Sequence, residues 1–246
     1  MHRESKNRSP IYDRLKVDCG NCSLSSLCIP RGLKKEDIVK LSDVVSAQKT
    51  LGRRDYLYHE GDPFRGLLSL KSGTCKIVST DSEGKEHILG MLLPGELFGF
   101  DALSTDIHTC SAIALETISY CELPANQLED LCLKVPGLLR ELFRHTGERI
   151  TDDTNMIVLN RSPADQRLAT FLVSLSDRYS RRGFSAVDFN LSMTRQEIGN
   201  HLGLALETVS RLLKQFEQKH LIDVQNKNIH IRDITALKSL SACDPM

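Results

Sequence analysis

The chain has 246 residues, of which 40% are hydrophobic and 26% are charged, with eight cysteines and no tryptophan. This length is sufficient for two ordinary domains, and the composition is that of a soluble globular protein, which argues against a disordered or fibrous class. Acidic and basic residues both number 32, so the overall charge indicates no particular partner. Residues 161–232, however, contain eleven lysines and arginines against seven aspartates and glutamates, which mildly favours an anionic partner there.

The first thirty residues are polar and charged, and they lack the apolar segment of a signal peptide. No apolar run approaches the roughly 18 to 20 residues that span a bilayer. We therefore expect a cytoplasmic protein, in which thiols stay reduced and clustered cysteines indicate metal or redox chemistry more than disulfides.

The first 32 residues are expected to form a poorly structured arm. Within it, "CGNCSLSSLC" (19–28) places Cys19, Cys22 and Cys28 in a C-x2-C-x5-C spacing. Thiolates select zinc, Cu(I) or iron–sulfur clusters. Zinc sites more often combine two C-x2-C pairs or add histidines, and this chain has a single C-x2-C. The spacing alone leaves a cluster, a zinc ion and unligated thiols open.

Residues 33–135 begin with a short segment of helical spacing, after which the pattern changes. Between Leu51 and Leu123, short apolar runs such as 75–79 and 87–93 alternate with glycine- and proline-containing turn signals. Regularly spaced short strands of this kind predict a small β-sandwich or barrel.

Residues 136–160 have an apolar stripe with helical spacing, which predicts one long helix between two domains. Periodicity alone fits an intramolecular core helix as well as a dimer seam. Two aspartates interrupt the stripe midway, where a two-fold seam would bring like charges together, and this detail favours the seam. The residues predicted at the dimer interface are Leu142, Thr146, Ile150, Asp152, Asp153 and Ile157.

Residues 161–246 are predicted to form a winged helix-turn-helix. A first helix over 162–179 has Ser162 as its expected N-cap and Pro163 as its first residue. Thr194 and Glu197 form a T-x-x-E capping box that opens a second helix, and Gly203 provides the turn to a third helix over 205–219. A hairpin around 226–228 follows. This combination favours DNA binding over a helical hairpin without that function.

The third helix presents Glu207, Ser210 and Arg211 on one polar face near its N-terminus, where a recognition helix contacts bases. Glu207 and Arg211 could instead form a surface ion pair. The residues predicted to contact phosphates are Arg195, Gln196, Lys214 and Lys227.

Several motifs together resemble the FNR branch of the CRP/FNR transcription regulators. They are C-x2-C-x5-C-I-P (19–30), "EGDPF" (60–64), "LPGELFGFDAL" (93–103), "CELP" (121–124), "TRQEIGNHLGL" (194–204) and the E-x-x-S-R face within "LGLALETVSRLLKQF". The resemblance extends over almost the whole chain, and the combination of the cysteine spacing with the E-x-x-S-R face is highly specific.

The resemblance implies an α+β fold. Its parts would be a cysteine-containing arm (1–32), a double-stranded β-roll like that of cyclic-nucleotide-binding proteins (33–135), a dimerisation helix (136–160) and a winged helix-turn-helix (161–246). It also implies a homodimer that binds a TTGAT-N4-ATCAA-like palindrome and RNA polymerase.

The resemblance further implies one [4Fe–4S] cluster per subunit, held by Cys19, Cys22, Cys28 and Cys121. In this family the intact cluster supports the dimer, whereas oxygen converts it to [2Fe–2S] and then removes it. Only "CELP" selects Cys121 as the fourth ligand. The remaining thiols are expected to be core or surface residues; they are Cys75, Cys110, Cys132 and Cys243.

The chain departs from its cyclic-AMP-binding relatives at one element. Gly95-Glu96 is present, but "HTCSAIA" (108–114) lacks an arginine for a cyclic phosphate, so we expect no cyclic nucleotide. Ala205 stands where many relatives have a capping Ser or Thr, which weakens the helix start by about 1 kcal/mol.

Two alternative functions stay open from the residues. One is a regulator with structural zinc or a small-molecule effector, and the other is a non-regulatory cluster carrier. No nucleophile elbow, P-loop or H-E-x-x-H motif is present, so we expect no enzyme.

Overall fold

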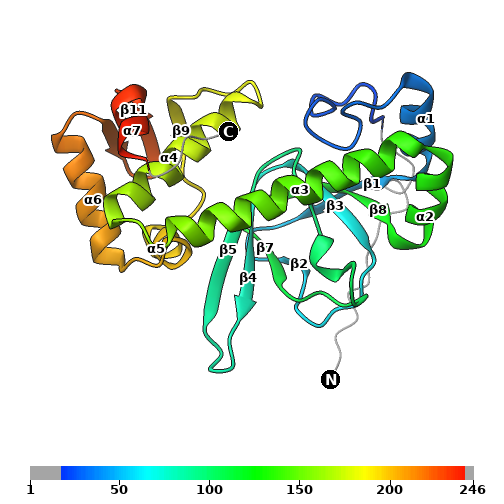
Figure 1. The fold of residues 1–246 in the computed structure, drawn as a ribbon, viewed down its shortest axis with the longest axis horizontal. Helices are drawn as coiled ribbons and strands as arrows, with labels where there is room; N and C mark the ends of the chain where they lie inside the picture. The colour runs from blue at the N-terminus through cyan, green and yellow to red at the C-terminus, as the bar shows by residue number, and fades with distance from the viewer. Residues whose placement is uncertain (1–17, 242–246) are drawn as a thin grey trace.

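The computed structural model describes residues 18–241, apart from the side chains of residues 47 and 48. A β-domain and a helical domain are joined by one long helix, α3 (Pro136–Leu159), which runs across the molecule (Figure 1). The described part of the chain therefore has the predicted order of β-domain, long helix and helical C-terminal domain.

The β-domain consists of two four-stranded antiparallel sheets. One has the order β1 (Ser46–Leu51), β8 (Ile118–Pro124), β3 (Gly66–Ser72), β6 (Leu97–Phe98), and the other β2 (Tyr56–Tyr58), β7 (Ser111–Ala114), β4 (Cys75–Thr80), β5 (Glu86–Leu92). Helices α1 (Lys35–Val44) and α2 (Ala125–Lys134) and the 3-10 turn η2 (Phe100–Ala102) complete it. Leu68, Leu70 and Ile77 point between the sheets and form the core there. The predicted β-roll is confirmed.

The segment 18–32 differs from the expected unstructured arm. It forms successive turns in which Cys19, Ile29 and Pro30 are buried. Ile29 belongs to an apolar cluster with Leu67 and Leu123 on the outer face of the β1-β8-β3-β6 sheet. The segment is ordered because its few apolar side chains cover that face, which would otherwise be exposed. Residues 1–17, also assigned to the arm, lie outside the described residues.

The C-terminal domain comprises α4 (Ala164–Ser180), β9 (Asp188–Asn190), α5 (Arg195–Leu202), α6 (Leu206–Gln218), β10 (Ile222–Gln225), β11 (Asn228–Ile231) and α7 (Ile234–Leu240). The predicted capping box is confirmed, since Thr194 Oγ1 accepts from Glu197 N at 3.2 Å and Glu197 Oε2 accepts from Thr194 N at 2.8 Å. Gly203 ends α5 with a φ of 63°. The β10–β11 hairpin turns through the predicted residues, and β9 adds a third strand.

The predicted cap of α4 is wrong. The helix begins at Ala164, and Pro163 occupies the N-cap position without a capping hydrogen bond. Ser162 instead donates its backbone N–H to Leu159 O at 2.9 Å, so it belongs to the turn that ends α3.

An ion-pair cluster joins the two domains. Arg178 on α4 donates to both carboxylate oxygens of Glu96, at 3.0 and 2.6 Å, and Arg182 donates to Oε1 at 2.6 Å. Burial by itself raises the pKa of Glu96, but the charges of Arg178 and Arg182 outweigh it, so the pKa is lowered. Nearby, Asn200 on α5 bonds the backbone of Glu86 and Ile88 in β5.

We expect Glu96→Gln to destabilise the folded chain by about 1–3 kcal/mol at pH 7, because two arginines lose their shared anion. A lowered carboxyl pKa stabilises the fold above the unfolded pKa and stops doing so as pH falls through the folded value. The difference between wild type and variant should therefore shrink on acidification below about pH 4, and urea unfolding at several pH values measures this. Glu83→Gln, in the exposed β4–β5 turn, is the control, and its free energy of unfolding at neutral pH should equal that of wild type.

Candidate metal centre and nucleic-acid interface

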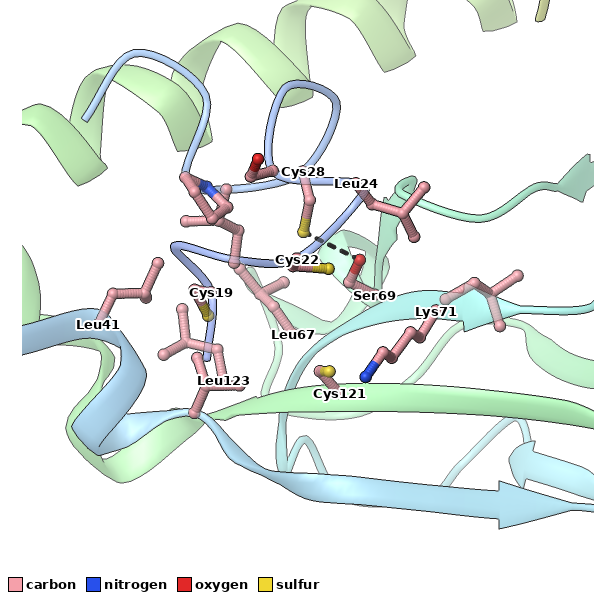
Figure 2. Close-up of a pocket in the computed structure, with 15 residues that line it drawn as sticks. Cys19, Cys22, Leu24, Cys28, Leu41, Leu67, Ser69, Lys71, Cys121 and Leu123 are labelled. Atoms are coloured by element: carbon pink, nitrogen blue, oxygen red, sulfur yellow. Dashed lines mark hydrogen bonds between the residues drawn. The ribbon is translucent and has the colours of Figure 1, made fainter. Parts of the chain in front are cut away.

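The four predicted cysteine ligands line one cavity. Cys19, Cys22 and Cys28 come from the turns of segment 18–32, and Cys121 comes from β8 on the sheet beneath them (Figure 2). Most of the remaining lining is aliphatic, and it includes no histidine or carboxylate side chain. The other lining residues are Leu24, Ser25, Ile29, Pro30, Leu41, Val45, Leu67, Ser69, Leu70, Lys71 and Leu123.

Burial keeps three of these thiols protonated when no metal is bound. It raises the pKa of Cys28 to about 12, against the opposing hydrogen bond from Ser69, and the pKa of Cys121 to about 11. Burial also raises the pKa of Cys19. Because a metal ligand must be a thiolate, binding of a metal group in the cavity would release protons from these three residues.

The donor set suits a cluster better than a single ion. Within residues 18–241, no three cysteine, histidine, aspartate or glutamate side chains converge as ligands of one metal ion. The four thiols instead surround a cavity from two sides. A [4Fe–4S] cluster takes one thiolate on each iron, so its ligands must surround a body rather than meet at a point. The number, softness and placement of the thiols fit this group.

The other described cysteines lie elsewhere. Cys75 and Cys110 are buried in the core between the two sheets, and burial raises the pKa of Cys110 to about 12. Cys132 is half-buried on α2 beside the apolar cluster beneath the loop. Cys243 lies outside the described residues.

The cysteine loop, residues 18–32, and the residue that follows it contact α3. Gly32 has a φ of +80°, and a Cβ at this position would lie 2.7 Å from Oε1 of the buried Glu141 on α3. Arg31 pairs with Glu148 at 3.6 Å, and Leu33 packs against Gly137. The sequence pattern does not predict this contact, although a glycine two residues after Pro30 is a signal for a tight turn.

The loop also contacts the segment that holds Glu96. Gly95 has a φ of +88°, and a Cβ there would lie 3.0 Å from Leu27 Cβ. The cysteine loop thus contacts Gly95, and the arginines at and just beyond the end of α4 bind the neighbouring Glu96. The sequence pattern does not predict this second contact either.

One face of α3 is apolar and exposed. Leu139, Phe143, Ile150 and Ile157 are 47, 68, 62 and 62% exposed. With Thr146 and Asp153 they follow alternating spacings of four and three, which is the pattern of a two-helix seam. Ile150 and Ile157, two of the residues predicted at a dimer interface, are among these exposed side chains.

Two predicted interface residues are placed differently. Leu142 is half-buried and packs on the cluster formed by Leu138 and Leu131 of its own chain, so it belongs to the intramolecular core. Asp153 lies on the stripe and pairs with Arg149 at 3.2 Å. Asp152 is one residue off the stripe, where burial raises its pKa and the nearby charge of Arg178 opposes this. Of the two aspartates, Asp153 is therefore the one that lies on the exposed stripe.

The predicted base-reading residues lie on one open face of α6. Glu207 and Arg211 are exposed and Ser210 is half-exposed, whereas Val209 and Leu213 are buried against the domain core. In the described part of the chain, no ion pair joins Glu207 to Arg211.

The predicted phosphate-contacting residues surround that face. Arg195 and Gln196 are exposed at the start of α5, and Lys214 is exposed one turn after Arg211. Lys227 lies in the β10–β11 turn and donates to Ser192 O at 3.5 Å. Base-reading and phosphate-contacting candidates therefore come from both helices and the wing.

Comparison with known proteins agrees with this geometry. Residues 166–240 match the Crp-like helix-turn-helix domain, and residues 48–134 match the cyclic nucleotide-binding domain. The chain is 44% identical over 227 residues to the transcriptional activator protein Anr of Pseudomonas protegens, covering 92% of this chain and 93% of the relative. The chain belongs to the CRP/FNR family. Within it, the chain is an anaerobic transcription regulator of the FNR/Anr type.

Two further comparisons agree with the assignment. The fumarate and nitrate reduction regulatory protein of Yersinia pestis is 40% identical over 226 residues, with 92% of this chain and 90% of the relative covered. The structure of FixK2 from Bradyrhizobium japonicum superposes with a TM-score of 0.73 at 26% identity, covering 80% of this chain and 98% of that one.

Family membership makes this chain a DNA-binding regulator and not an enzyme. Among the described residues, no helix has both the length and the apolar character needed to cross a membrane. Glu96, the acidic residue of the cyclic-nucleotide motif, is engaged by Arg178 and Arg182 in this CRP/FNR protein.

Proposed function

We propose that the chain is an oxygen-responsive cytoplasmic regulator whose [4Fe–4S] cluster is held by Cys19, Cys22, Cys28 and Cys121. The observation that supports this is the cavity in which three loop thiols face a fourth thiol on β8. When bound, the cluster supplies an oxygen-labile bridge between the loop and the sheet. With the cluster intact, the chain forms a homodimer that activates or represses transcription together with RNA polymerase.

The loop residues connect this site to α3. Arg31, Gly32 and Leu33 lie three to five residues after Cys28 and contact Glu148, Glu141 and Gly137, respectively, on that helix. A loop held in place by four ligands keeps these contacts, and a released loop loses them. The cluster shifts the monomer–dimer equilibrium only by its differential affinity for the two states, and these contacts provide such a difference.

The dimer would present two recognition helices to two half-sites. We propose that it binds a palindrome resembling TTGAT-N4-ATCAA, since a two-fold protein matches a two-fold operator. Arg211 and Glu207 would contact the G·C pair from its two strands, and Ser210 a neighbouring thymine.

Anaerobic purification tests the proposal. We expect a brown protein with about four irons and four sulfides per chain, equivalent to about one cluster per subunit, that bleaches in air. After exposure to air, sedimentation should show less dimer, and the affinity for a duplex that contains the palindrome should fall. A colourless protein that holds stoichiometric zinc would support the zinc-containing regulator instead, and an iron–sulfur protein without DNA binding would support the cluster carrier.

Arg211→Ala should weaken binding by about 1–3 kcal/mol and relax discrimination at the G·C pair of the half-site, because a bidentate contact to guanine is lost. Lys214→Ala, one turn further along α6, should weaken all sequences equally and reduce the dependence of affinity on salt. Binding to duplexes substituted at each position, at several salt concentrations, separates the two effects. Unchanged base preference in Arg211→Ala would remove this residue from direct readout.

A further inference from the structure

Two polar side chains lie on the sheet face that forms the floor of the cysteine cavity. Side chains alternate along β3, so that Leu68 and Leu70 enter the core between the sheets and Leu67, Ser69 and Lys71 face the cysteine loop. A face packed under a loop would ordinarily be aliphatic, as Leu67 is. Ser69 and Lys71 therefore require another explanation.

Each of the two lies beside the thiols at a defined position. Ser69 is buried, its Oγ lies 3.1 Å from Cys28 Sγ, and the β3–β8 register places it directly opposite Cys121. Lys71 is exposed overall but lines the cavity, with its ammonium directed toward Cys121 (Figure 2). Of the residues that the structure describes, Lys71 is the one cationic side chain in the lining of the cavity.

We infer that Ser69 and Lys71 are positioning residues for the cluster, with Ser69 donating a hydrogen bond to the Cys28 thiolate and Lys71 providing the counter-charge at the rim. This inference rests on the proposed function. Four thiolates around a doubly positive iron–sulfur core give a net charge of about −2, which an aliphatic cavity disfavours unless donors and a cation compensate it. Partners of this kind beyond the ligands orient them and strengthen binding.

The experiment uses the full chain, purified anaerobically, and follows loss of the cluster absorption to an excess of a ferrous chelator without oxygen. We expect Lys71→Met and Ser69→Ala to lose the cluster about tenfold faster than wild type, which is the usual effect of removing such a partner. Lys71→Arg should restore the wild-type rate. Lys85→Met removes the same charge from the exposed β4–β5 turn and should have no effect.

The dependence of the rates on salt distinguishes an effect of the Lys71 charge from an effect of its packing. If Lys71 acts by its charge, the difference between wild type and Lys71→Met narrows as salt rises, since a charge at the rim is screened. If salt does not narrow the difference in the rate of cluster loss between wild type and Lys71→Met, and Lys71→Arg does not restore the wild-type rate, the counter-charge role of Lys71 is overturned. Equal rates in wild type, Lys71→Met and Ser69→Ala overturn the inference but leave the proposed function intact. A wild-type chain that binds neither iron nor sulfide overturns the proposed function itself.

Discussion

We expect Cys121→Ala to abolish stable cluster binding, with iron and sulfide falling from about one cluster per subunit to background in anaerobic preparations. The reason is that Cys121 is the single proposed ligand outside the loop, on the sheet that the loop covers. Without it, one iron is open to solvent, and the loop has no bond to β8. Iron and sulfide analysis, together with absorption, measures the loss. Cys19→Ala, Cys22→Ala and Cys28→Ala should give the same result.

Cys132→Ala is the matched control, since this thiol lies beside the same apolar cluster but does not line the cavity. It should retain normal iron and sulfide. Cys243→Ala should behave likewise. If Cys121→Ala retained a normal iron content, the assignment of the fourth ligand would be wrong and another thiol, Cys132 first, would have to replace it.

The second large effect concerns the exposed stripe of α3. Ile150→Glu should leave even the anaerobic, cluster-containing protein monomeric, because two carboxylates would meet in an apolar seam at a cost on the order of several kcal/mol. Asp153→Ala should strengthen dimerisation. Removing one like-charge pair from the seam favours the dimer by about 1–2 kcal/mol, or roughly 5–30-fold in the association constant.

Sedimentation of each variant with and without the cluster provides the measurement. Asp153→Ala should dimerise and bind DNA in air, at an unaltered sequence. Asp152→Ala removes the same charge one residue off the stripe, so it should have a smaller effect on dimerisation. If Asp153→Ala dimerised no better than wild type, Asp153 would lie outside the seam and the switch would have to be sought elsewhere.

Local patterns in the sequence determined much of the architecture. The turn signals between short apolar runs predicted the β-roll, and the capping box at Thr194 with the glycine at 203 predicted the helix-turn-helix. These features depend on residues close together in the chain, where backbone preference and side-chain capping act directly. The cap of α4 failed because the extended conformation of Pro163 moved the helix start by one residue.

Contacts between distant segments were decided only by the tertiary structure. Helical periodicity placed Leu142 on the stripe, but packing against Leu138 and Leu131 of the same chain turned it inward. Other contacts also join segments far apart in sequence. They are the packing of the cysteine loop on the sheet, the ion pairs of Arg178 and Arg182 with Glu96, and the contact of Ser69 with Cys28. Such contacts depend on which faces the sheets and helices present to one another, and a one-dimensional pattern does not contain that information.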